Sequence, residues 1–369
     1  MKSHDLHPAV DKALERVRSG AAELMTRHAV ASSTPMRECL VALNRLSGET
    51  MTLFVVDEEG RMAGTMTDGD IRRAIIGGAS VSDTAESLMH RDFMALTPPD
   101  TPWKKIAEAR RRGITLLPRL DAEGYVQDIM DLRLQHSALP VDAVLMAGGR
   151  GERLRPLTLT TPKPLLKVGG KPIIDYNVEE LRANGIEKIR VTVNYLKEQL
   201  IDHFSHPRFG GYVECVEEPR RLGTMGSLSL VGDLTNDFVL VMNSDILTTL
   251  DFEKLYLAHI ESGAALTMAV IPYTVSVPFS IIRTEGDRVT GLTEKPTYNY
   301  FAGAGVYLMD RRLMARISPG EYLDAPDFVE SLIVDGLKVG YFPIDGTWID
   351  IGSPDDYRYA DELMSRPVQ

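Results

Sequence analysis

The pattern of apolar and polar positions changes near residue 140, which predicts two differently organised parts of the chain. Before this point, apolar runs are short and interrupted by charge. After it, VDAVLMAGG is a continuous apolar run ending in glycines, as expected of a buried parallel strand that enters a tight turn. Pro140 interrupts the chain here, so we place a linker at 136–140, between a first domain at 1–135 and a second at 141–369.

The second part alternates apolar runs with amphipathic segments, and this alternation predicts a mixed, mainly parallel α/β sheet with helices on both faces. Asn184-Gly185 is typical of a helix C-terminus, and Ser353-Pro354 is typical of a helix start. The predicted strands are 141–147, 188–194, 212–217, 237–242, 265–271, 303–308 and 340–344. The predicted helices are 173–184, 196–204, 226–232, 251–262 and 325–335.

The first part is internally doubled. Residues 49–77 read as strand, turn, strand and helix, and residues 114–135 repeat that order up to a helical start. An amphipathic helix precedes each unit, PMRECLVALNRLS in the first and PWKKIAEARRRG in the second. We therefore predict two repeats, at about 28–80 and 88–135, that cover each other's apolar faces.

Composition narrows the class of protein. The 369 residues are 44% hydrophobic and 25% charged, the balance of a globular protein, and the net charge of −11 argues against nucleic-acid binding. The two cysteines, Cys39 and Cys215, are far apart, which argues against a disulfide framework or a zinc site. The N-terminal MKSHDLHPAV has no apolar export segment and no apolar run is long enough to span a membrane, so we expect a cytoplasmic location.

A glycine-rich turn follows the first strand of the second part, in LMAGGRGERLRPLTLTTPKPLLKV at 145–168. Gly148, Gly149 and Gly151 would let the backbone approach a triphosphate, and Arg153 and Lys163 could neutralise its charge. The dinucleotide-binding and P-loop fingerprints both fail here. A purely structural turn is the alternative, but it would not account for the two cations.

Two aspartates suit a divalent metal ion. Asp245 ends the apolar strand DFVLVMNSD, and Asp350 lies between two isoleucines in GTWIDIGSPDDY. A carboxylate beyond the carboxyl end of a strand lies where α/β proteins bind ligands, and Mg²⁺ prefers oxygen ligands. Each aspartate could instead cap a helix.

The segment LMAGGRGERLRPLT…PKPLLKVGGKPI resembles the signature of the sugar-phosphate nucleotidyltransferases over about 141–360. The resemblance implies a Rossmann-like, GT-A-like sheet and catalytic Arg153, Lys163, Asp245 and Asp350, the two aspartates holding Mg²⁺. It implies nucleotide contacts from Leu145, Met146, Ala147, Gly148, Gly149, Gly151, Asn194, Gly223 and Thr224. It implies sugar contacts from Gly226, Glu294, Lys295 and Gly305, although Glu294 and Lys295 alone would read as a surface ion pair.

GTMTDGDIRRAI at 64–75 resembles the closing motif of CBS domains. The resemblance implies that Thr67 and Asp70 hold an adenine or guanine nucleotide effector, while a helix cap is the alternative for Asp70. Asp131 and Leu134 replace this pair in the second repeat, so we expect at most one competent site. A structural or dimer-forming role for the pair is the alternative to sensing.

The order of the two parts resembles the guanylyltransferases of legionaminic acid biosynthesis. This implies GTP and N-acetylglucosamine or glucosamine 1-phosphate as substrates, and a product used for cell-surface polysaccharide. The alternatives are the same chemistry with mannose, heptose or glucose 1-phosphate and another base, or a nucleotide-sensing regulatory protein whose second domain only binds. We expect a homo-oligomer with neither nucleic-acid nor membrane partners.

Overall fold

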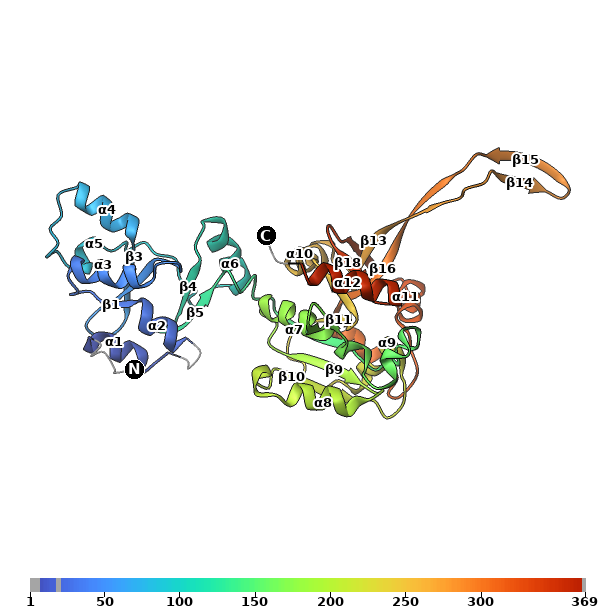
Figure 1. The fold of residues 1–369 in the computed structure, drawn as a ribbon, viewed down its shortest axis with the longest axis horizontal. Coiled ribbons are helices and arrows are strands. Elements are labelled where there is room, and N and C mark those ends of the chain that lie inside the picture. Colours follow the sequence, from blue (N-terminus) through green and yellow to red (C-terminus); the bar gives the residue numbers. More distant parts are fainter. Residues whose placement is uncertain (1–6, 18–20, 367–369) are drawn as a thin grey trace. The chain divides into compact units, whose positions relative to one another are not determined.

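The computed structural model describes residues 7–17 and 21–366. Residues 1–6, which belong to the N-terminal stretch without an export segment, lie outside the described residues. The chain forms two compact units, Met1–Ala138 and Leu139–Gln369 (Figure 1). Across the described ranges, no helix combines the length and the apolar character needed to cross a membrane.

The first unit contains a three-stranded sheet and a separate antiparallel strand pair. The sheet has the order β1-β2-β3, in which β1 and β2 are parallel and β2 and β3 are antiparallel. Its strands are β1 (Ala29–Ala31), β2 (Thr52–Val56) and β3 (Met62–Thr67), and the pair is β4 (Leu116–Leu120) and β5 (Val126–Asp131). Its helices are α1 (Pro8–Leu14), α2 (Ala22–His28), α3 (Met36–Arg45), α4 (Asp68–Ile76), α5 (Ala85–Leu88) and α6 (Pro102–Arg111).

The two predicted repeats share a helix and a strand pair but end differently. A common apolar cluster joins Phe54 of the first repeat to Leu116 and Val126 of the second. After β3 the chain enters α4, whereas turns follow β5, so the helical start predicted there is wrong. The Asp131 carboxylate accepts hydrogen bonds from the backbone and guanidinium of Arg133, which favours a local turn over a helix.

The second unit is built on a seven-stranded sheet of order β10-β9-β6-β11-β16-β13-β17. Only β16 runs against its neighbours, because β11 and β13 both pair with it in antiparallel fashion. The strands are β6 (Val141–Met146), β9 (Ile189–Val193), β10 (Val213–Glu217), β11 (Phe238–Asn243), β13 (Leu266–Ser276), β16 (Thr297–Asp310) and β17 (Val339–Pro343). The mixed, mainly parallel sheet predicted from the sequence is confirmed.

Helices cover both faces of this sheet. Val239 and Val241 of β11 pack in a cluster with Phe328, whereas Met242 lines a cavity with Tyr176 and Phe252. The helices are α7 (Ile173–Ala183), α8 (Lys197–Ser205), α9 (Gly223–Gly226), α10 (Phe252–Ser262), α11 (Ala325–Val334) and α12 (Pro354–Met364). Short strand pairs complete the unit: β7 (Lys167–Val168) with β8 (Lys171–Pro172), β12 (Ile246–Thr248) with β18 (Trp348–Asp350), and β14 (Ile281–Glu285) with β15 (Arg288–Thr293).

The helix predicted at 226–232 is wrong. The α-helical turn α9 ends at Gly226, and a 3-10 turn continues only to Leu230. The Ser229 hydroxyl donates to the Gly226 carbonyl at 2.7 Å, and such side-chain bonds compete with regular helix formation. The segment is therefore a compact turn that leads away from the carboxyl end of β10.

Candidate active site

A cleft lies at the carboxyl ends of β6 and β11, where successive connections leave the sheet in opposite directions. From β6 the chain proceeds to β9 and β10 on one side, and then returns to place β11 on the other. Such a switch point opens a crevice in α/β proteins. Here the cavity is about 530 Å³ and is lined by the glycine-rich turn, Lys163, Glu218, Thr224 and the Asn243–Asp245 end of β11.

The glycines of the turn serve different purposes. A Cβ on Gly148 would lie 2.5 Å from a carboxylate oxygen of Glu218, and one on Gly151 would lie 2.9 Å from Thr158. A Cβ on Gly149 would meet nothing within 4 Å. Gly148 and Gly151 are thus required by close packing of the protein itself, and Gly151 also has φ +59°. At Gly149 the backbone faces open space in the cleft.

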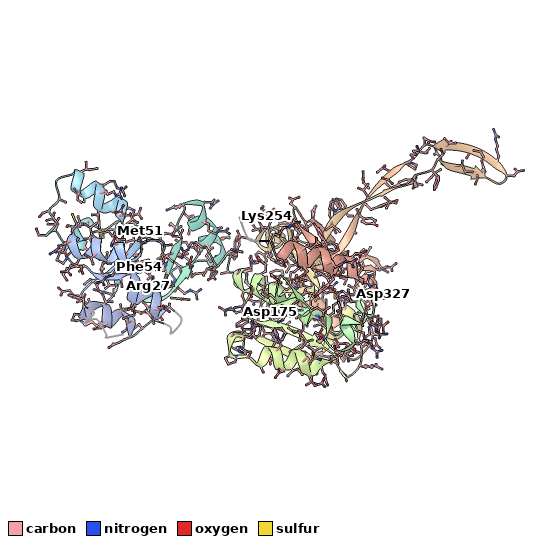
Figure 2. All side chains as sticks on the ribbon, in the orientation of Figure 1. Arg27, Met51, Phe54, Asp175, Lys254 and Asp327 are labelled. Atoms are coloured by element: carbon pink, nitrogen blue, oxygen red, sulfur yellow. The ribbon has the colours of Figure 1, made fainter. Side chains whose placement is uncertain are left out.

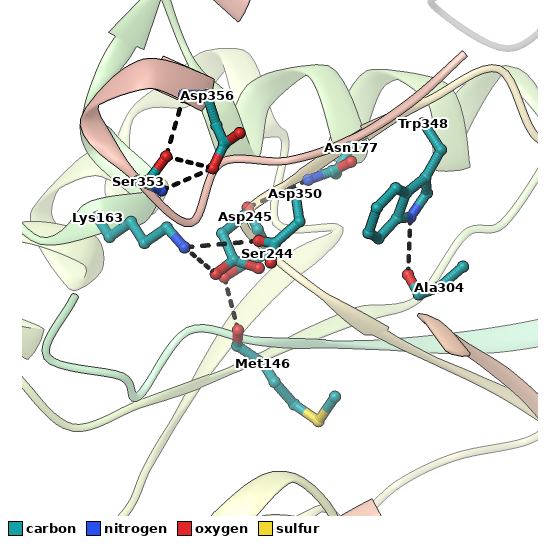
Figure 3. Close-up of polar contacts among 10 residues, drawn as sticks. All are labelled: Met146, Lys163, Asn177, Ser244, Asp245, Ala304, Trp348, Asp350, Ser353 and Asp356. Atoms are coloured by element: carbon teal, nitrogen blue, oxygen red, sulfur yellow. Dashed lines mark hydrogen bonds and ion pairs between the residues drawn. The ribbon is translucent and has the colours of Figure 1, made fainter. Parts of the chain in front are cut away.

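Lys163 connects the two aspartates (Figure 3). Its ammonium group donates a hydrogen bond to Asp245 and lies 3.8 Å from a carboxylate oxygen of Asp350. The Lys163 side chain is only 9% exposed, because the flanking prolines begin a short 3-10 turn that holds it in the cleft. Two carboxylates distant in the sequence therefore share one cation.

The pairing of β12 with β18 brings the two carboxylates together. Ile246, next to Asp245, is opposite Asp350 in this antiparallel pair, and the Ile351 backbone donates to the Asp245 carbonyl at 3.1 Å. The Trp348 indole donates to the Ala304 carbonyl at 2.9 Å and ties β18 to β16 (Figure 3). Neither aspartate is a helix cap, since β12 follows Asp245 and Ser353 caps α12.

The surroundings of Asp350 disfavour its ionised form. Burial raises the pKa of Asp350, and the neighbouring Asp245 raises it further. Lys163 and Arg153 lower the pKa of Asp350 but do not cancel these effects. In the part of the chain that the structure describes, no group of three or more His, Cys, Asp or Glu side chains is arranged to hold a metal. A metal here would therefore have two carboxylate ligands and take the others from water or substrate.

Glu218 is a cleft residue that sequence reasoning missed. It is 5% exposed, and its carboxylate accepts a hydrogen bond from the Leu222 backbone at 3.1 Å. Burial raises the pKa of this carboxyl, and the hydrogen bond from Leu222 lowers it only in part. Its position just beyond β10, at the same sheet edge as Asp245, is the signal that could have identified it.

Several predicted residues line the cleft and others only support it. Met146, Ala147, Gly223 and Thr224 line it, as do Gly148, Gly149, Gly151 and Arg153. The Leu145 side chain is buried in the core. Asn194 donates to the Glu218 carbonyl at 3.0 Å and so positions that residue.

The small residues predicted to contact nucleotide or sugar are required by packing. A Cβ on Gly223 would lie 2.6 Å from the Leu323 carbonyl, and one on Gly226 would lie 2.4 Å from that of Glu321. A Cβ on Gly305 would lie 2.5 Å from the Asn243 amide. At these glycines the backbone packs closely against neighbouring segments, and of the three Gly223 lies in the lining of the cleft.

Glu294 and Lys295 are not brought to the cleft. Both are exposed on a two-stranded extension of the sheet, and Glu294 accepts a hydrogen bond from Ser280. They form no ion pair with each other in the described chain. The structure thus separates the two predicted sugar-binding side chains from Lys163 and the aspartates.

In the first unit, Thr67 and Asp70 bind each other. Thr67 is the N-cap of α4, and its hydroxyl donates to the Asp70 carboxylate at 2.6 Å, while the Thr67 backbone donates to the same oxygen at 2.8 Å. This reciprocal arrangement is a capping box. The Asp70 carboxylate therefore takes part in the cap of α4, and any nucleotide would have to bind alongside this cap.

Comparisons with known proteins match different families to parts of the two units. The family model described as Nucleotidyl transferase matches residues 142–366, and the CBS domain model matches residues 21–77. The mannose-1-phosphate guanylyltransferase of Mycobacterium tuberculosis is 33% identical over 226 residues, and the mannose-1-phosphate guanyltransferase of Schizosaccharomyces pombe is 30% identical over 225.

These matches are partial in length. The two relatives match 59% and 58% of this chain, which in turn spans 62% of the length of each. Among solved structures, HddC from Yersinia pseudotuberculosis is 24% identical with a TM-score of 0.47. That comparison covers 60% of this chain and 98% of HddC.

Proposed function

Because this chain belongs to the nucleotidyl transferase family, we propose that it transfers a nucleoside monophosphate from a nucleoside triphosphate to a sugar 1-phosphate and releases pyrophosphate. The observation that carries the proposal is the convergence of Asp245, Asp350 and Lys163 beside the glycine-rich turn. Opposed charges at the end of a nucleotide-sized cleft suit the transfer of a charged group.

Different residues of the cleft assist different parts of the in-line displacement. A phosphate oxygen of the sugar 1-phosphate attacks the α-phosphorus while the bond to the pyrophosphate oxygen breaks. Arg153 neutralises the departing pyrophosphate, and Lys163 neutralises the transferring group. The open backbone at Gly149 leaves room for the phosphate chain. Positioning and charge neutralisation suffice for this reaction, so no covalent intermediate with the protein is needed.

The donor set fits Mg²⁺. Asp245 and Asp350 supply the oxygen ligands that this ion prefers, and both carboxylates face the Lys163 ammonium, so an ion held beside Lys163 would contact both. Bound there, the ion would supply neutralisation of charge on the α-phosphate. The raised pKa of Asp350 supports the assignment, because a carboxylate penalised by burial and by a like charge gains most from a cation.

Glu218 supports guanine as the base. The Watson–Crick edge of guanine presents two adjacent donors, N1–H and the 2-amino group, and a carboxylate can accept both. Adenine presents an acceptor at N1, and this acceptor and an ionised carboxylate repel each other. A desolvated carboxylate beside the cleft should therefore select a base with paired donors.

The names of the relatives, which are mannose-1-phosphate guanylyltransferases, support mannose 1-phosphate as the acceptor of this chain rather than N-acetylglucosamine or glucosamine 1-phosphate. This choice corresponds to the first alternative from the sequence, the same chemistry with another sugar. The regulatory protein with a binding-only domain is the less economical alternative, because both carboxylates and both cations of the cleft are retained.

A pyrophosphate-release assay tests the reaction and its substrates. It would combine ATP, GTP, CTP, UTP and dTTP with the 1-phosphates of mannose, N-acetylglucosamine, glucosamine, glucose and heptose, in the presence of Mg²⁺. We expect release with GTP and mannose 1-phosphate. Release that prefers another pair would correct the substrates alone, and no release with any pair would refute the transferase function.

The Asp245→Asn variant tests the metal-binding assignment. It should lower kcat by at least about 100-fold, because one of two charged ligands is lost while the fold persists. Asp251→Asn is the matched control, since that aspartate caps α10 outside the lining of the cleft. Comparable turnover of a folded Asp245→Asn protein and the control would refute the role of Asp245.

The Glu218→Gln variant tests base selection. An amide can accept from only one of the two guanine donors, so kcat/KM for GTP should fall by about 10-fold or more relative to that for ATP. The competition between the two triphosphates measures this ratio directly. An unchanged GTP preference would show that another group reads the base.

A further inference from the structure

A two-stranded arm, residues 272–301, extends from the seven-stranded sheet. It consists of the outer parts of β13 and β16 followed by the hairpin of β14 and β15 (Figure 1). Among the strands that the structure describes, β17 pairs with β13 only as far as Val270, and β11 pairs with β16 only as far as Val306. The arm thus continues without a third strand. An isolated two-stranded ribbon is at best marginally stable in water.

One face of the arm is apolar and the other polar. Tyr273 is paired with Tyr300, and Val275 with Tyr298, so these four side chains share a face. Tyr298 and Tyr300 are stacked with their ring centroids 6.4 Å apart. The pairs on the opposite face are Thr274 with Asn299, whose side chains are hydrogen-bonded at 2.9 Å, and Ser276 with Thr297. At the base of the arm this face also carries Pro272 and Phe301, and Phe301 packs against Tyr341 of β17 with the ring centroids 5.3 Å apart. This alternation is typical of a strand pair with one face covered.

The apolar character continues towards the tip. Ile282 and Leu292 are directly opposite each other in the hairpin and are 54% and 61% exposed. Phe279, between the two parts of the arm, is 74% exposed. Figure 2 shows the side chains of the arm standing clear of the rest of the second unit.

The apolar face of the arm exposes several large side chains. The three tyrosines of the apolar face, Tyr273, Tyr298 and Tyr300, expose on the order of 300 Å², since full burial of one aromatic side chain covers ~150–250 Å² and these are 39–57% exposed. Four exposed aliphatic side chains, Val275, Ile282, Val289 and Leu292, add to this. Together they reach the size of the largest apolar patch on a typical monomer, about 300–600 Å², and such patches are often interaction sites, one side of a standard interface burying ~800 Å².

The charges of the arm favour a second copy of the same chain as its binding partner. The arm carries three basic residues, Arg283, Arg288 and Lys295, and three acidic ones, Glu285, Asp287 and Glu294, so its net charge is zero. The whole chain has a net charge of −11, all of which therefore lies outside the arm. Two copies repel each other through most of their surfaces and can approach where their charge is balanced.

We propose that the apolar face of the arm is an interface with the arm of a second copy of this chain. A twofold axis would place the tyrosine and valine pairs of one arm against those of the other, as an isologous contact requires. The contact would cover the exposed aromatic side chains and provide the support that a free ribbon lacks. This inference does not depend on the reaction proposed for the cleft.

Sedimentation equilibrium of the full chain tests the proposal. The wild-type protein should be a dimer, and the double variant Tyr273→Ser/Tyr300→Ser should raise the dimer dissociation constant by at least about 100-fold, because central aromatic side chains dominate such interfaces. The matched control on the polar face, Thr274→Ser/Asn299→Ser, should remain dimeric. Circular dichroism would establish that both variants are folded.

A second variant keeps the proposal testable if the first fails to fold. Val275→Lys leaves the tyrosines intact and places like charges in the twofold contact, so it should also yield monomers. A monomeric wild-type protein would overturn the proposal and would indicate that the arm is covered within its own chain or by another protein. A dimer that resists both the tyrosine and the lysine variants would overturn it as well.

Discussion

At the scale of single residues, burial and charge act against each other in the cleft. Glu218 is buried with a raised pKa, and Asp350 has a pKa raised first by burial and then by Asp245. Such carboxyl groups reduce stability when they ionise, because the folded state holds its proton more tightly than the unfolded chain does. Groups with this property are typical of ligand-binding sites.

Unfolding of the Glu218→Gln variant at several pH values tests whether ionisation of Glu218 lowers the stability of the fold. An unfolded glutamate has a pKa of about 4.3, and the folded value is raised, so ionisation removes stability as the pH rises from about 4 through the folded pKa. The variant does not lose stability in this way, because glutamine does not ionise. Its free energy of unfolding relative to wild type should therefore be higher at pH 7 than at pH 4, as measured by denaturant unfolding.

The control for this series is Glu217→Gln. Glu217 is exposed and pairs with Lys197 at the surface, so its replacement should have little effect. If the stability difference between Glu218→Gln and wild type were the same at pH 4 and pH 7, the buried-carboxylate interpretation would be wrong.

At the scale of elements, the cleft depends on short pieces that periodicity does not predict. The sequence predicted the parallel strands, since each contains several apolar residues between helical or turn segments. It did not predict β12 and β18, which have only three residues each and are stabilised by pairing with each other. The extensions of β13 and β16 into the arm were missed because their polar face interrupts the apolar run.

Helix α12 should help to position Asp350, because it begins four residues after that aspartate. Ser353 and Asp356 form a capping box at its start, with hydrogen bonds of 2.6–3.3 Å (Figure 3). Ser353→Ala should lower the free energy of unfolding by ~1 kcal/mol. It should also raise the Mg²⁺ concentration needed for half-maximal activity, since the Asp350 backbone would be less constrained.

A second cap provides the comparison for this prediction. Asp251 caps α10, and its side chain accepts from the Lys254 backbone at 2.9 Å. Asp251→Ala should lower stability by a similar amount without changing the Mg²⁺ requirement. An equal shift of the Mg²⁺ requirement in both variants would mean that stability alone is responsible.

At the scale of the whole molecule, the chain combines a nucleotidyl transferase unit with a unit matched by the CBS domain model. A match to CBS domains suggests a nucleotide ligand for the first unit. Any regulation would act through a coupling free energy of ~1–3 kcal/mol, which corresponds to at most ~150-fold in affinity.

Titration of ATP, AMP and GTP against the rate of pyrophosphate release tests for such regulation. We expect a nucleotide to change the rate, and Asp70→Ala to abolish the change, because Asp70 lies in the first turn of the helix in the CBS motif. Asp100→Ala is the matched control, since Asp100 accepts similar bonds from Thr97 in the second repeat. A rate that is insensitive to all three nucleotides would leave the first unit a structural role.

The sequence by itself determined the mainly parallel sheet, the glycine-rich turn and the identities of Lys163, Asp245 and Asp350, because apolar runs and turn residues are local signals. Only the tertiary structure decided that the two aspartates share Lys163, since this depends on a strand pair formed across about 100 residues. It also placed Glu218 in the cleft and Glu294 and Lys295 on the arm. The convergence of side chains depends on which strands become neighbours, and that choice is made by packing of the whole unit.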